Sequence, residues 1–378
     1  MDNLKEFIFN QKELLLKTLK ELCLIPAPSH FEQKRAEYCK TWLENYGAKG
    51  VYIDEALNVI FPINCENSQE ITVVVAHTDT VFPDLEPMPY TDDGEKIYCP
   101  GVGDDTASVS VMLLTAKYFI EKNIRPKKGL MFVCNSCEEG LGNLKGTRQI
   151  FKDYAGRISQ FLSFDSKLNK IADRCVGSHR YKVEVATEGG HSYLAFGNRN
   201  AIAEISQIVN EIYSIKISEI GRSRTSYNVG TIEGGTSVNT IAQTASMLCE
   251  YRSDNIDCLA QMQSAFEVVF ARAKERGVDI KVSKIGERPC MGEVDLERIE
   301  NMANICEKIV QEVTGMKVER ESSSTDCNIP LSLGIPALCI GVYMGGEWHT
   351  RNEWVKKNSL LFGLEIGIKS VIVLSKEI

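Results

Sequence analysis

Two histidines and several acidic residues stand where apolar runs of the chain end or helices begin, and their side chains are of the types that bind metal ions. The set comprises His77, Asp79, Asp104, Glu138, Glu139, Asp165 and His349. Neutral imidazoles and carboxylates are common zinc ligands, and a carboxylate left over from the ligand set can act as a base. The sequence therefore predicts a metal-dependent hydrolase.

His77 and Asp79 lie two residues apart at the end of the apolar run Ile71–Ala76. Side chains at this spacing in a strand fall on one face. His77 can then bind a metal while Asp79 accepts the hydrogen of its other ring nitrogen, which fixes the tautomer. A lone His-x-Asp more often marks a strand end without chemistry, but the other acids of the set favour the metal site.

Two adjacent acidic pairs complete this pattern. Asp104 and Asp105 precede a helix that we expect over Ala107 to Ile120. Asp105 fits the N-cap of that helix, whereas Asp104 can direct both of its oxygens toward two metals. Because adjacent side chains diverge in extended backbone, one of Glu138 and Glu139 can bind metal while the other faces a bound water.

The sum of charges supports two ions in one site. Two Zn²⁺ ions carry four positive charges, which three carboxylates and one hydroxide balance, so that no net charge is buried. The ligands in this scheme are the carboxylates Asp104, Glu139 and Asp165 and the neutral imidazoles His77 and His349. Glu138 is then free to act as general base. Cobalt or manganese could occupy the same ligands.

The elements that must position these residues alternate between apolar runs and helical patterns. Strands are expected over Asn58–Pro62, Ile71–Ala76, Leu130–Cys134, Phe161–Phe164 and Ile335–Ile340. Continuous apolar runs of this kind are typical of an α/β fold with a mostly parallel sheet that helices cover on both faces. Ser29 with Glu32 three residues later forms a capping-box pattern, which predicts that Ser29 caps the helix leading to Tyr46.

The pattern changes near Gly177, where polar and apolar residues begin to alternate. From there to about residue 287 the order strand, helix, strand, strand, helix, strand is expected, which is that of a ferredoxin-like α+β domain. We therefore predict a discontinuous metal-binding domain, residues 1–176 and 288–378, with residues 177–287 inserted as a second domain.

Composition narrows the possible partners and the compartment. The 378-residue chain has a net charge of −8 and no dense basic block, which argues against nucleic acid and membrane surfaces. Its N-terminus lacks a signal-peptide pattern, and no apolar stretch reaches the ~18 residues that span a bilayer. The thirteen cysteines are scattered, which favours free thiols in a reducing cytoplasm over disulfides.

With these residues in view, the chain resembles the M20 metallopeptidases, the family of peptidase T-like tripeptidases, carboxypeptidase G2-like enzymes and amino-acid N-deacylases. The matching strings are His77-Thr78-Asp79, Gly103-Asp104-Asp105, Glu138-Glu139, Asp165, Gly190-His191-Ser192, Gly234-Gly235-Thr236-Ser237-Val238-Asn239, Ser324-Thr325-Asp326 and His349. Each string alone is weak, but together they are specific and run through almost the whole chain.

The resemblance assigns roles to the metal-site residues. It implies that one zinc is bound by His77 and Asp165, that the other is bound by Glu139 and His349, and that Asp104 bridges them. It further implies that Glu138 is the base and that Asp79 orients His77. Peptidase members tend to have aspartate where this chain has Asp165, which favours peptide cleavage. Where the family often has lysine two residues after the bridging aspartate, this chain has Thr106, a change we expect to affect local electrostatics and not metal binding.

Three residues of the inserted domain complete the expectation. By resemblance, His191 stabilises the oxyanion of the tetrahedral intermediate, often in the active site of a partner subunit. Asn239 follows a glycine-rich turn and could hydrogen-bond the substrate. Arg252 could bind a substrate carboxylate through two hydrogen bonds, although a solvated strand arginine fits the pattern equally well.

The sequence thus favours a cytoplasmic, tripeptidase-like dinuclear zinc exopeptidase that acts on short peptides and forms a homodimer through the inserted domain. An N-acyl-amino-acid amidohydrolase could use the same ligands. A non-catalytic binding protein on this fold is a third hypothesis, against which the intact Glu138 and the full ligand set argue.

Overall fold

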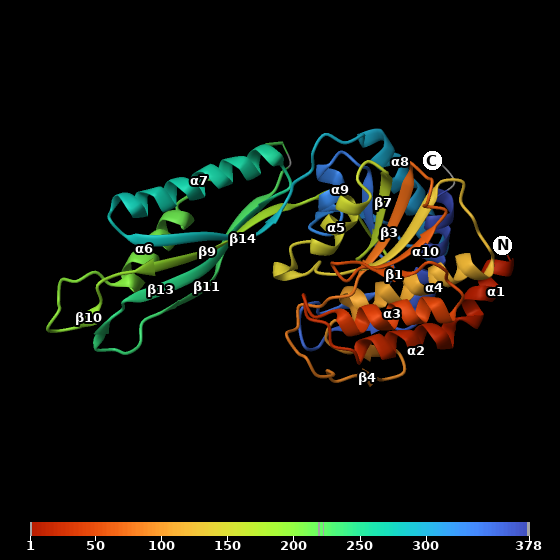
Figure 1. Cartoon of the computed structure of the whole chain (residues 1–378), viewed down its shortest axis with the longest axis horizontal. Helices are drawn as coiled ribbons and strands as arrows, with labels where there is room; N and C mark the ends of the chain where they lie inside the picture. The colour runs from red at the N-terminus through yellow and green to blue at the C-terminus, as the bar shows by residue number, and fades with distance from the viewer. Residues whose placement is uncertain (1, 218–219, 222, 376–378) are drawn as a thin grey trace. The chain divides into compact units, whose positions relative to one another are not determined.

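The computed structural model describes residues 2–217, 220–221 and 223–375. It divides into two compact units, which we call the larger unit and the inserted unit. The larger unit comprises the residues up to Cys175 together with those from Glu293 onward, and the inserted unit comprises Val176–Gly292. The inserted unit thus interrupts the sequence of the larger one, as the colours of Figure 1 show.

An eight-stranded sheet forms the centre of the larger unit, in the order β1-β2-β6-β3-β7-β16-β8-β15. Its strands are β1 (Tyr52–Ile53), β2 (Val59–Ile63), β3 (Ile71–His77), β6 (Gly129–Asn135), β7 (Ile158–Phe164), β8 (Lys170–Cys175), β15 (Glu319–Ser323) and β16 (Ala337–Ile340). β6, β3, β7 and β16 run parallel to one another, whereas β1, β2 and β6 pair antiparallel, as do β16 and β8. The predicted mostly parallel α/β sheet is confirmed.

Helices cover both faces of this sheet (Figure 1). They are α1 (Asp2–Asn10), α2 (Lys12–Cys23), α3 (Gln33–Asn45), α4 (Ser108–Glu121), α5 (Lys145–Asp153), α8 (Leu296–Thr314), α9 (Asn328–Ser332) and α10 (Ser359–Leu374). Every residue of β3 and of β6 is buried, which explains why these strands are apolar almost throughout. Two short helical turns, η1 (Val102–Ala107) and η2 (Gly140–Gly142), adjoin the predicted site residues.

Some strands of the larger unit were not predicted from the sequence. β8 was not predicted, because Lys170, Asp173 and Arg174 interrupt any apolar run. It lies next to the edge strand β15, where burial is incomplete and polar side chains are tolerated. A separate small sheet in the order β17-β18-β5-β4 was also missed. Its strands are only two or three residues long: β4 (Thr91–Asp92), β5 (Lys96–Tyr98), β17 (Gly345–Gly346) and β18 (Trp354–Lys356).

The inserted unit has the predicted β-α-β-β-α-β order. Its elements are β9 (Gly177–Ala186), α6 (Ala201–Tyr213), β11 (Thr225–Gly234), β13 (Thr244–Ser253), α7 (Ile256–Glu275) and β14 (Asp279–Arg288), with a small ladder of β10 (Gly190–His191) and β12 (Thr240–Ile241). The main sheet is antiparallel throughout, in the order β11-β13-β9-β14, and both helices lie on one of its faces (Figure 1). Inward side chains such as Val183, Ile205 and Phe266 form one core between sheet and helices.

The predicted capping box at the start of α3 is wrong. Glu32 occupies the N-cap position, and no side chain caps the helix. The Ser29 hydroxyl donates instead to Asp79 Oδ2 (2.7 Å), and Glu32 Oε1 accepts the backbone N–H of Cys137 (2.9 Å). Tertiary partners have therefore replaced the local contacts that the spacing suggested.

Within the described residues, no helix combines the length and the apolar character that crossing a membrane requires.

Candidate metal centre

The parallel strands bring distant parts of the sequence together at one edge of the larger unit's sheet. His77 is the last residue of β3 and lies opposite Asn135, the last residue of β6. Glu138 and Glu139 follow β6 directly, and Asp165 follows β7, the other neighbour of β3. Because parallel strands end at the same edge, these side chains meet there although they are far apart in sequence.

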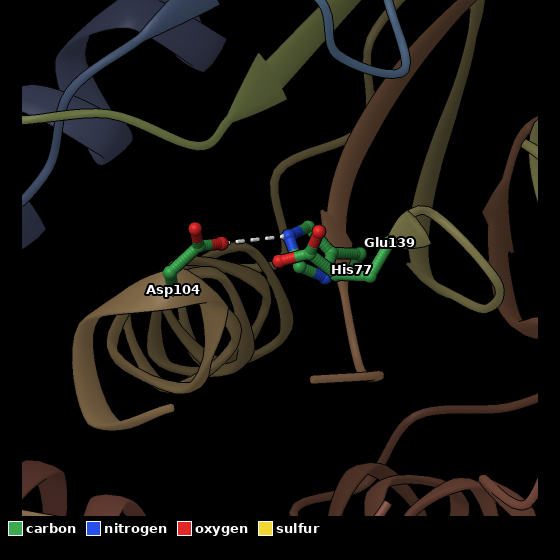
Figure 2. Close-up of side chains that lie close together, drawn as sticks. All are labelled: His77, Asp104 and Glu139. Carbon is green, nitrogen blue, oxygen red and sulfur yellow. Dashed lines mark hydrogen bonds and ion pairs between the residues drawn. The ribbon is translucent and has the colours of Figure 1, made fainter. Parts of the chain in front are cut away.

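Asp104 lies between the two histidines of the set. His77 Nε2 is 3.1 Å from Asp104 Oδ1, and His349 Nε2 is 3.1 Å from Asp104 Oδ2. His349 Nε2 also lies 3.1 Å from Glu139 Oε1. Figure 2 shows Asp104, within η1, pointing toward the ring of His77 with Glu139 beside it. Each oxygen of one carboxylate thus faces a different imidazole.

These separations fit a site for divalent ions. Two ligand atoms that lie 2.0–2.1 Å from one tetrahedral zinc ion are about 3.3 Å apart. One ligand atom from each of His77, Asp104 and Glu139 lies within 4.8 Å of the others, and the same holds for His77, Asp105 and Asp165. His77 Nε2 and Asp165 Oδ1 are 4.0 Å apart. The donor set and its spacing therefore suit imidazole- and carboxylate-binding cations.

Asp105 does not cap α4, contrary to one reading of the sequence. The N-cap position belongs to Ala107, and no side chain caps it. The buried Asp105 carboxylate turns toward the site: Oδ2 accepts the backbone N–H of His77 (3.0 Å), and Oδ1 has no hydrogen-bond partner. Burial raises the pKa of this carboxyl well above its usual range. Asp105 is therefore a neighbour of the candidate ligands, and it holds the backbone of one of them.

The carboxylates and imidazoles strongly perturb one another. Burial and the neighbouring Asp104 raise the pKa of Glu139 to about 7. Burial, with Asp105 and Asp104 close by, raises the pKa of Asp165 well above its usual range. Hydrogen bonds to Asp104 and Glu139 raise the pKa of His349 to about 10. So many acids in a buried space repel each other as anions, and a bound cation would relieve that repulsion.

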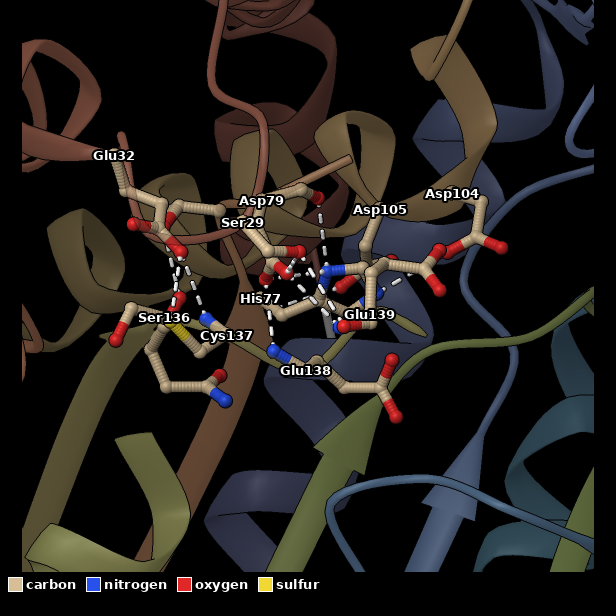
Figure 3. A network of polar contacts seen from close by, with 12 residues as sticks. Ser29, Glu32, His77, Asp79, Asp104, Asp105, Ser136, Cys137, Glu138 and Glu139 are labelled. Carbon is tan, nitrogen blue, oxygen red and sulfur yellow. Dashed lines mark hydrogen bonds and ion pairs between the residues drawn. The ribbon is translucent and has the colours of Figure 1, made fainter. Parts of the chain in front are cut away.

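Asp79 connects His77 to both glutamates. His77 Nδ1 lies 3.1 Å from the backbone oxygen of Asp79 and 3.4 Å from its carboxylate Oδ1. Oδ1 accepts the backbone N–H of Glu138 (2.9 Å), while Oδ2 accepts that of Glu139 (2.9 Å). The Ser29 hydroxyl adds a third hydrogen bond (Figure 3). Burial opposes the charge of Asp79, but His77 and these donors outweigh burial and lower the pKa of its carboxyl. Asp79 thus contacts His77 chiefly through its backbone oxygen, and its carboxylate fixes the backbone of Glu138 and Glu139.

Glu353 is a buried residue of the site to which the sequence analysis gave no role. Its carboxylate accepts three backbone N–H groups, those of Gly101 (3.0 Å), Gly103 (2.8 Å) and Asp104 (2.8 Å). Burial, together with the nearby Asp104, raises the pKa of Glu353 to about 7. Its position four residues after His349 could have indicated a place near the site. A single glutamate in a polar segment does not, however, show which backbone N–H groups it will accept.

Two further buried residues form hydrogen bonds with residues next to the candidate ligands. Asp326 accepts from Asn135 Nδ2 (2.7 Å) and from the hydroxyl of Thr147, and so ties the end of β6 to α5. Arg35 Nη1 donates to Thr78 O (2.8 Å) and to Thr106 Oγ1 (3.1 Å). The hydroxyl of Thr106 thus accepts from the buried guanidinium of Arg35.

The other three predicted residues belong to the inserted unit. His191, in β10, pairs with Thr240 and is exposed. Asn239 is exposed and accepts the N–H of Ser192 through its backbone oxygen (2.9 Å). Arg252, in β13, is already paired: Nε and Nη2 donate to the two carboxylate oxygens of Glu250, at 2.7 and 3.1 Å. A substrate carboxylate would have to share or displace Glu250.

Comparison with known proteins supports the fold and the predicted family. Succinyl-diaminopimelate desuccinylase of Corynebacterium glutamicum is 22% identical over 338 residues, which cover 87% of this chain and 88% of that protein. Aminopeptidase PepT from Bacillus cereus has a similar fold, with a TM-score of 0.71 and 21% identity over 97% of this chain and 99% of that one. A dinuclear metal-binding M20 peptidase from Bacillus subtilis gives a TM-score of 0.63 at 15% identity, covering 96% and 98% of the two chains.

The family match itself spans most of the chain and takes in all the candidate ligands. The model described as peptidase family M20/M25/M40 matches residues 73–371, a stretch that begins within β3 and ends within α10. The chain belongs to peptidase family M20/M25/M40 and is a hydrolase of that family.

Proposed function

We propose that this protein is a dinuclear zinc-dependent exopeptidase that hydrolyses short peptides. The observation that carries the proposal is the position of Asp104, whose two oxygens each lie 3.1 Å from the Nε2 atom of a different histidine. A carboxylate in this position can bridge two ions. His77 and Asp165 would hold one ion and Glu139 and His349 the other. The solved dinuclear metal-binding peptidase of similar fold supports this assignment.

Two bound ions would polarise the scissile carbonyl and acidify a water molecule between them. The protein's own part in the reaction is proton transfer and orientation. Glu138 is buried beside the candidate ligands, and its backbone is fixed by Asp79. In this position it can take a proton from the attacking water and then pass it to the leaving amine.

His191 is proposed to stabilise the oxyanion. Its Nδ1 faces the backbone N–H groups of Tyr193 (3.2 Å) and Leu194 (3.4 Å), so Nδ1 is the acceptor. The ring hydrogen is then on Nε2, which makes Nε2 a donor toward a developing negative charge. Asn239 and Arg252 are proposed substrate contacts of the same unit.

A homodimer through the inserted unit is proposed as the working assembly. β11 is an edge strand of the four-stranded sheet, and its outward side chains are largely exposed. An edge of this kind can pair with the same edge of a second copy about a two-fold axis. We also propose a reducing, cytoplasmic location, which is supported by the burial of all thirteen cysteines.

The rival function is hydrolysis of N-acyl amino acids, which the similarity to a desuccinylase favours. The test is a panel of di- and tripeptides, N-acetyl amino acids and N-succinyl amino acids, each assayed with enzyme reconstituted with zinc, cobalt or manganese. The proposal expects the highest kcat/KM on short peptides. A higher kcat/KM on acylated amino acids would replace it with the deacylase, and peptides blocked at one end would show which terminus is cleaved.

A further inference from the structure

The turn that carries Glu138 and Glu139 has its backbone N–H groups held by side chains from elsewhere in the fold. We call residues 136–139 the glutamate turn. Each of its four consecutive backbone N–H groups donates to a side-chain oxygen. The bonds run from Ser136 to Asn58 Oδ1 (3.1 Å), from Cys137 to Glu32 Oε1 (2.9 Å), from Glu138 to Asp79 Oδ1 (2.9 Å) and from Glu139 to Asp79 Oδ2 (2.9 Å).

Such support is needed because the backbone here is not in a regular conformation. Cys137 has a φ of +55°, in the left-handed region that non-glycine residues seldom adopt. Its N–H comes after the last residue of β6 and before η2, so the sheet ladder does not fix it. The position of the next residue, Glu138, therefore depends on the acceptor that holds Cys137 as well as on Asp79, which accepts the N–H of Glu138 itself.

That acceptor, Glu32, has no other evident task. It is fully buried, and its Oε1 contacts both the backbone nitrogen of Cys137 and its Sγ (3.2 Å). Its Oε2 has no hydrogen-bond partner, and the side chain does not cap α3 although it stands at the N-cap position. A buried carboxylate is costly unless its hydrogen bonds compensate, so its contact with Cys137 needs a reason.

Glu32 also acts together with Ser29 of the same segment. The Ser29 hydroxyl lies 2.7 Å from Asp79 Oδ2 and 3.3 Å from the backbone oxygen of Glu139. The segment from Ser29 to Glu32 thus contacts the glutamate turn on both sides of Glu138, as Figure 3 shows. It lies outside the stretch that matches the family, residues 73–371.

We propose that Glu32 is a positioning residue for catalysis: by holding the backbone of Cys137 it aims Glu138 at the water it must deprotonate. This inference rests on the proposed function, since it takes Glu138 as the base. Glu32 contacts neither a candidate ligand side chain nor the substrate. It acts through Cys137, whose backbone N–H and thiol both donate to Glu32 Oε1.

Glu32→Ala removes the acceptor and tests the proposal. We expect kcat to fall by about 10- to 100-fold while KM stays near that of the wild type, because misplacing a reacting group slows the chemical step. Hydrogen exchange of the amides of residues 136–139 should become faster. Glu32→Gln keeps an oxygen that can accept the N–H of Cys137 and should restore most of kcat and of the amide protection.

Glu32→Asp separates position from charge. It keeps the carboxylate but shortens the side chain by one methylene, so it should lose more kcat than Glu32→Gln. If charge were what mattered, the order would be reversed. This pair also serves if Glu32→Ala does not fold, because both variants keep a polar group at the site. Equal and wild-type-like kcat in Glu32→Gln and Glu32→Asp would overturn the proposal.

A stability control comes from the same helical layer. Thr18→Val removes the buried hydrogen bond from Trp42 Nε1 to Thr18 Oγ1 (3.1 Å), away from the glutamate turn. It should lower Tm and leave kcat and the exchange of residues 136–139 unchanged. If Glu32→Ala lowers kcat no more than Thr18→Val does, or leaves that exchange unchanged, Glu32 is merely structural. Hydrogen exchange needs no turnover, so an inactive wild type would reject the proposed function, whereas the exchange of residues 136–139 would still show whether Glu32 holds the glutamate turn.

Discussion

The larger unit and the inserted unit hold their candidate site residues in opposite ways. In the larger unit the side chains of His77 and Asp79 are 1% and 0% exposed, and neighbouring groups fix each of them. In the inserted unit His191 and Asn239 are exposed. His191 belongs to the two-strand ladder outside the main sheet, and Asn239 directly precedes the second strand of that ladder. The larger unit is preorganised, whereas the inserted unit presents its groups to solvent.

The difference follows from what each set of groups must do. Ligands for an ion must be held within a few tenths of an ångström, and only buried partners impose that precision. A group that stabilises an oxyanion meets its target only once substrate is bound, so it can lie on an exposed ladder until then. His349 combines both conditions: its side chain is 53% exposed, yet Asp104 and Glu139 hold its Nε2 atom.

The largest loss of activity should come from a substitution in the larger unit. Glu138→Gln removes the base and leaves the candidate ligands in place, so kcat should fall by about 10⁴-fold while the metal content stays at the wild-type level. Steady-state kinetics and elemental analysis of the same preparation measure both quantities. Glu139→Gln is the matched variant and should lose metal. If both variants lost metal equally, the roles assigned to the pair would be wrong.

A substitution in the inserted unit should give a smaller loss of activity, which a second chain can restore. His191→Ala removes the oxyanion donor and should lower kcat by about 10²- to 10³-fold. Refolding it together with Glu138→Ala tests whether His191 acts in the partner's site. Random pairing makes about half of the dimers mixed, and each mixed dimer has one complete site, so roughly a quarter of wild-type activity should return.

Verified heterodimers without recovered activity would place His191 in the site of its own chain. Each protein refolded alone is the control, and neither should recover. This experiment decides whether the Glu138 and the His191 that serve one active site belong to the same chain or to two different chains.

A moderate effect is expected from the acceptor that holds Asp104. Glu353→Gln leaves only one oxygen for three backbone N–H groups, so the loop from Gly101 to Asp104 should loosen. Metal affinity should fall by about 10- to 100-fold, which competition with a chromophoric chelator would measure. Glu347→Gln, an exposed glutamate near His349, is the control and should bind metal normally. Unchanged affinity in Glu353→Gln would remove Glu353 from the site.

The smallest effect concerns pH in the metal-free protein. Hydrogen bonds to Asp104 and Glu139 raise the pKa of His349 to about 10. A raised histidine pKa contributes stability that is complete below about pH 6.5 and is lost as pH rises through the folded-state value. The Tm difference between wild type and His349→Ala should therefore shrink from about pH 7 to about pH 10. A difference that is constant over this range would show that His349 is not protonated there.

How much the sequence revealed depends on whether a residue's partners are local. His77, Asp104, Glu138, Glu139, Asp165 and His349 could be predicted as site residues because metal sites use a few chemical types of side chain and because several of these residues directly follow apolar runs. The βαββαβ order of the inserted unit was readable from periodicity alone.

What was missed or misread depends on tertiary contacts. Ser29 and Glu32 matched a capping box by spacing, but their partners are Asp79 and Cys137, which no local pattern reveals. Asp105 fitted an N-cap and instead holds the backbone of His77. Long-range hydrogen bonds of buried carboxylates leave no period in the sequence, so only the folded structure shows them.

Asp104, and not the adjacent Asp105, is proposed to bridge two ions. Elemental analysis of metal per chain in wild type, Asp104→Ala and Asp105→Asn tests it most directly, because both aspartates have oxygens close to other candidate ligands. The account predicts two ions in the wild type, loss of paired occupancy and of peptide hydrolysis in Asp104→Ala, and two ions retained in Asp105→Asn. Two ions retained in Asp104→Ala, or their loss in Asp105→Asn alone, would contradict it.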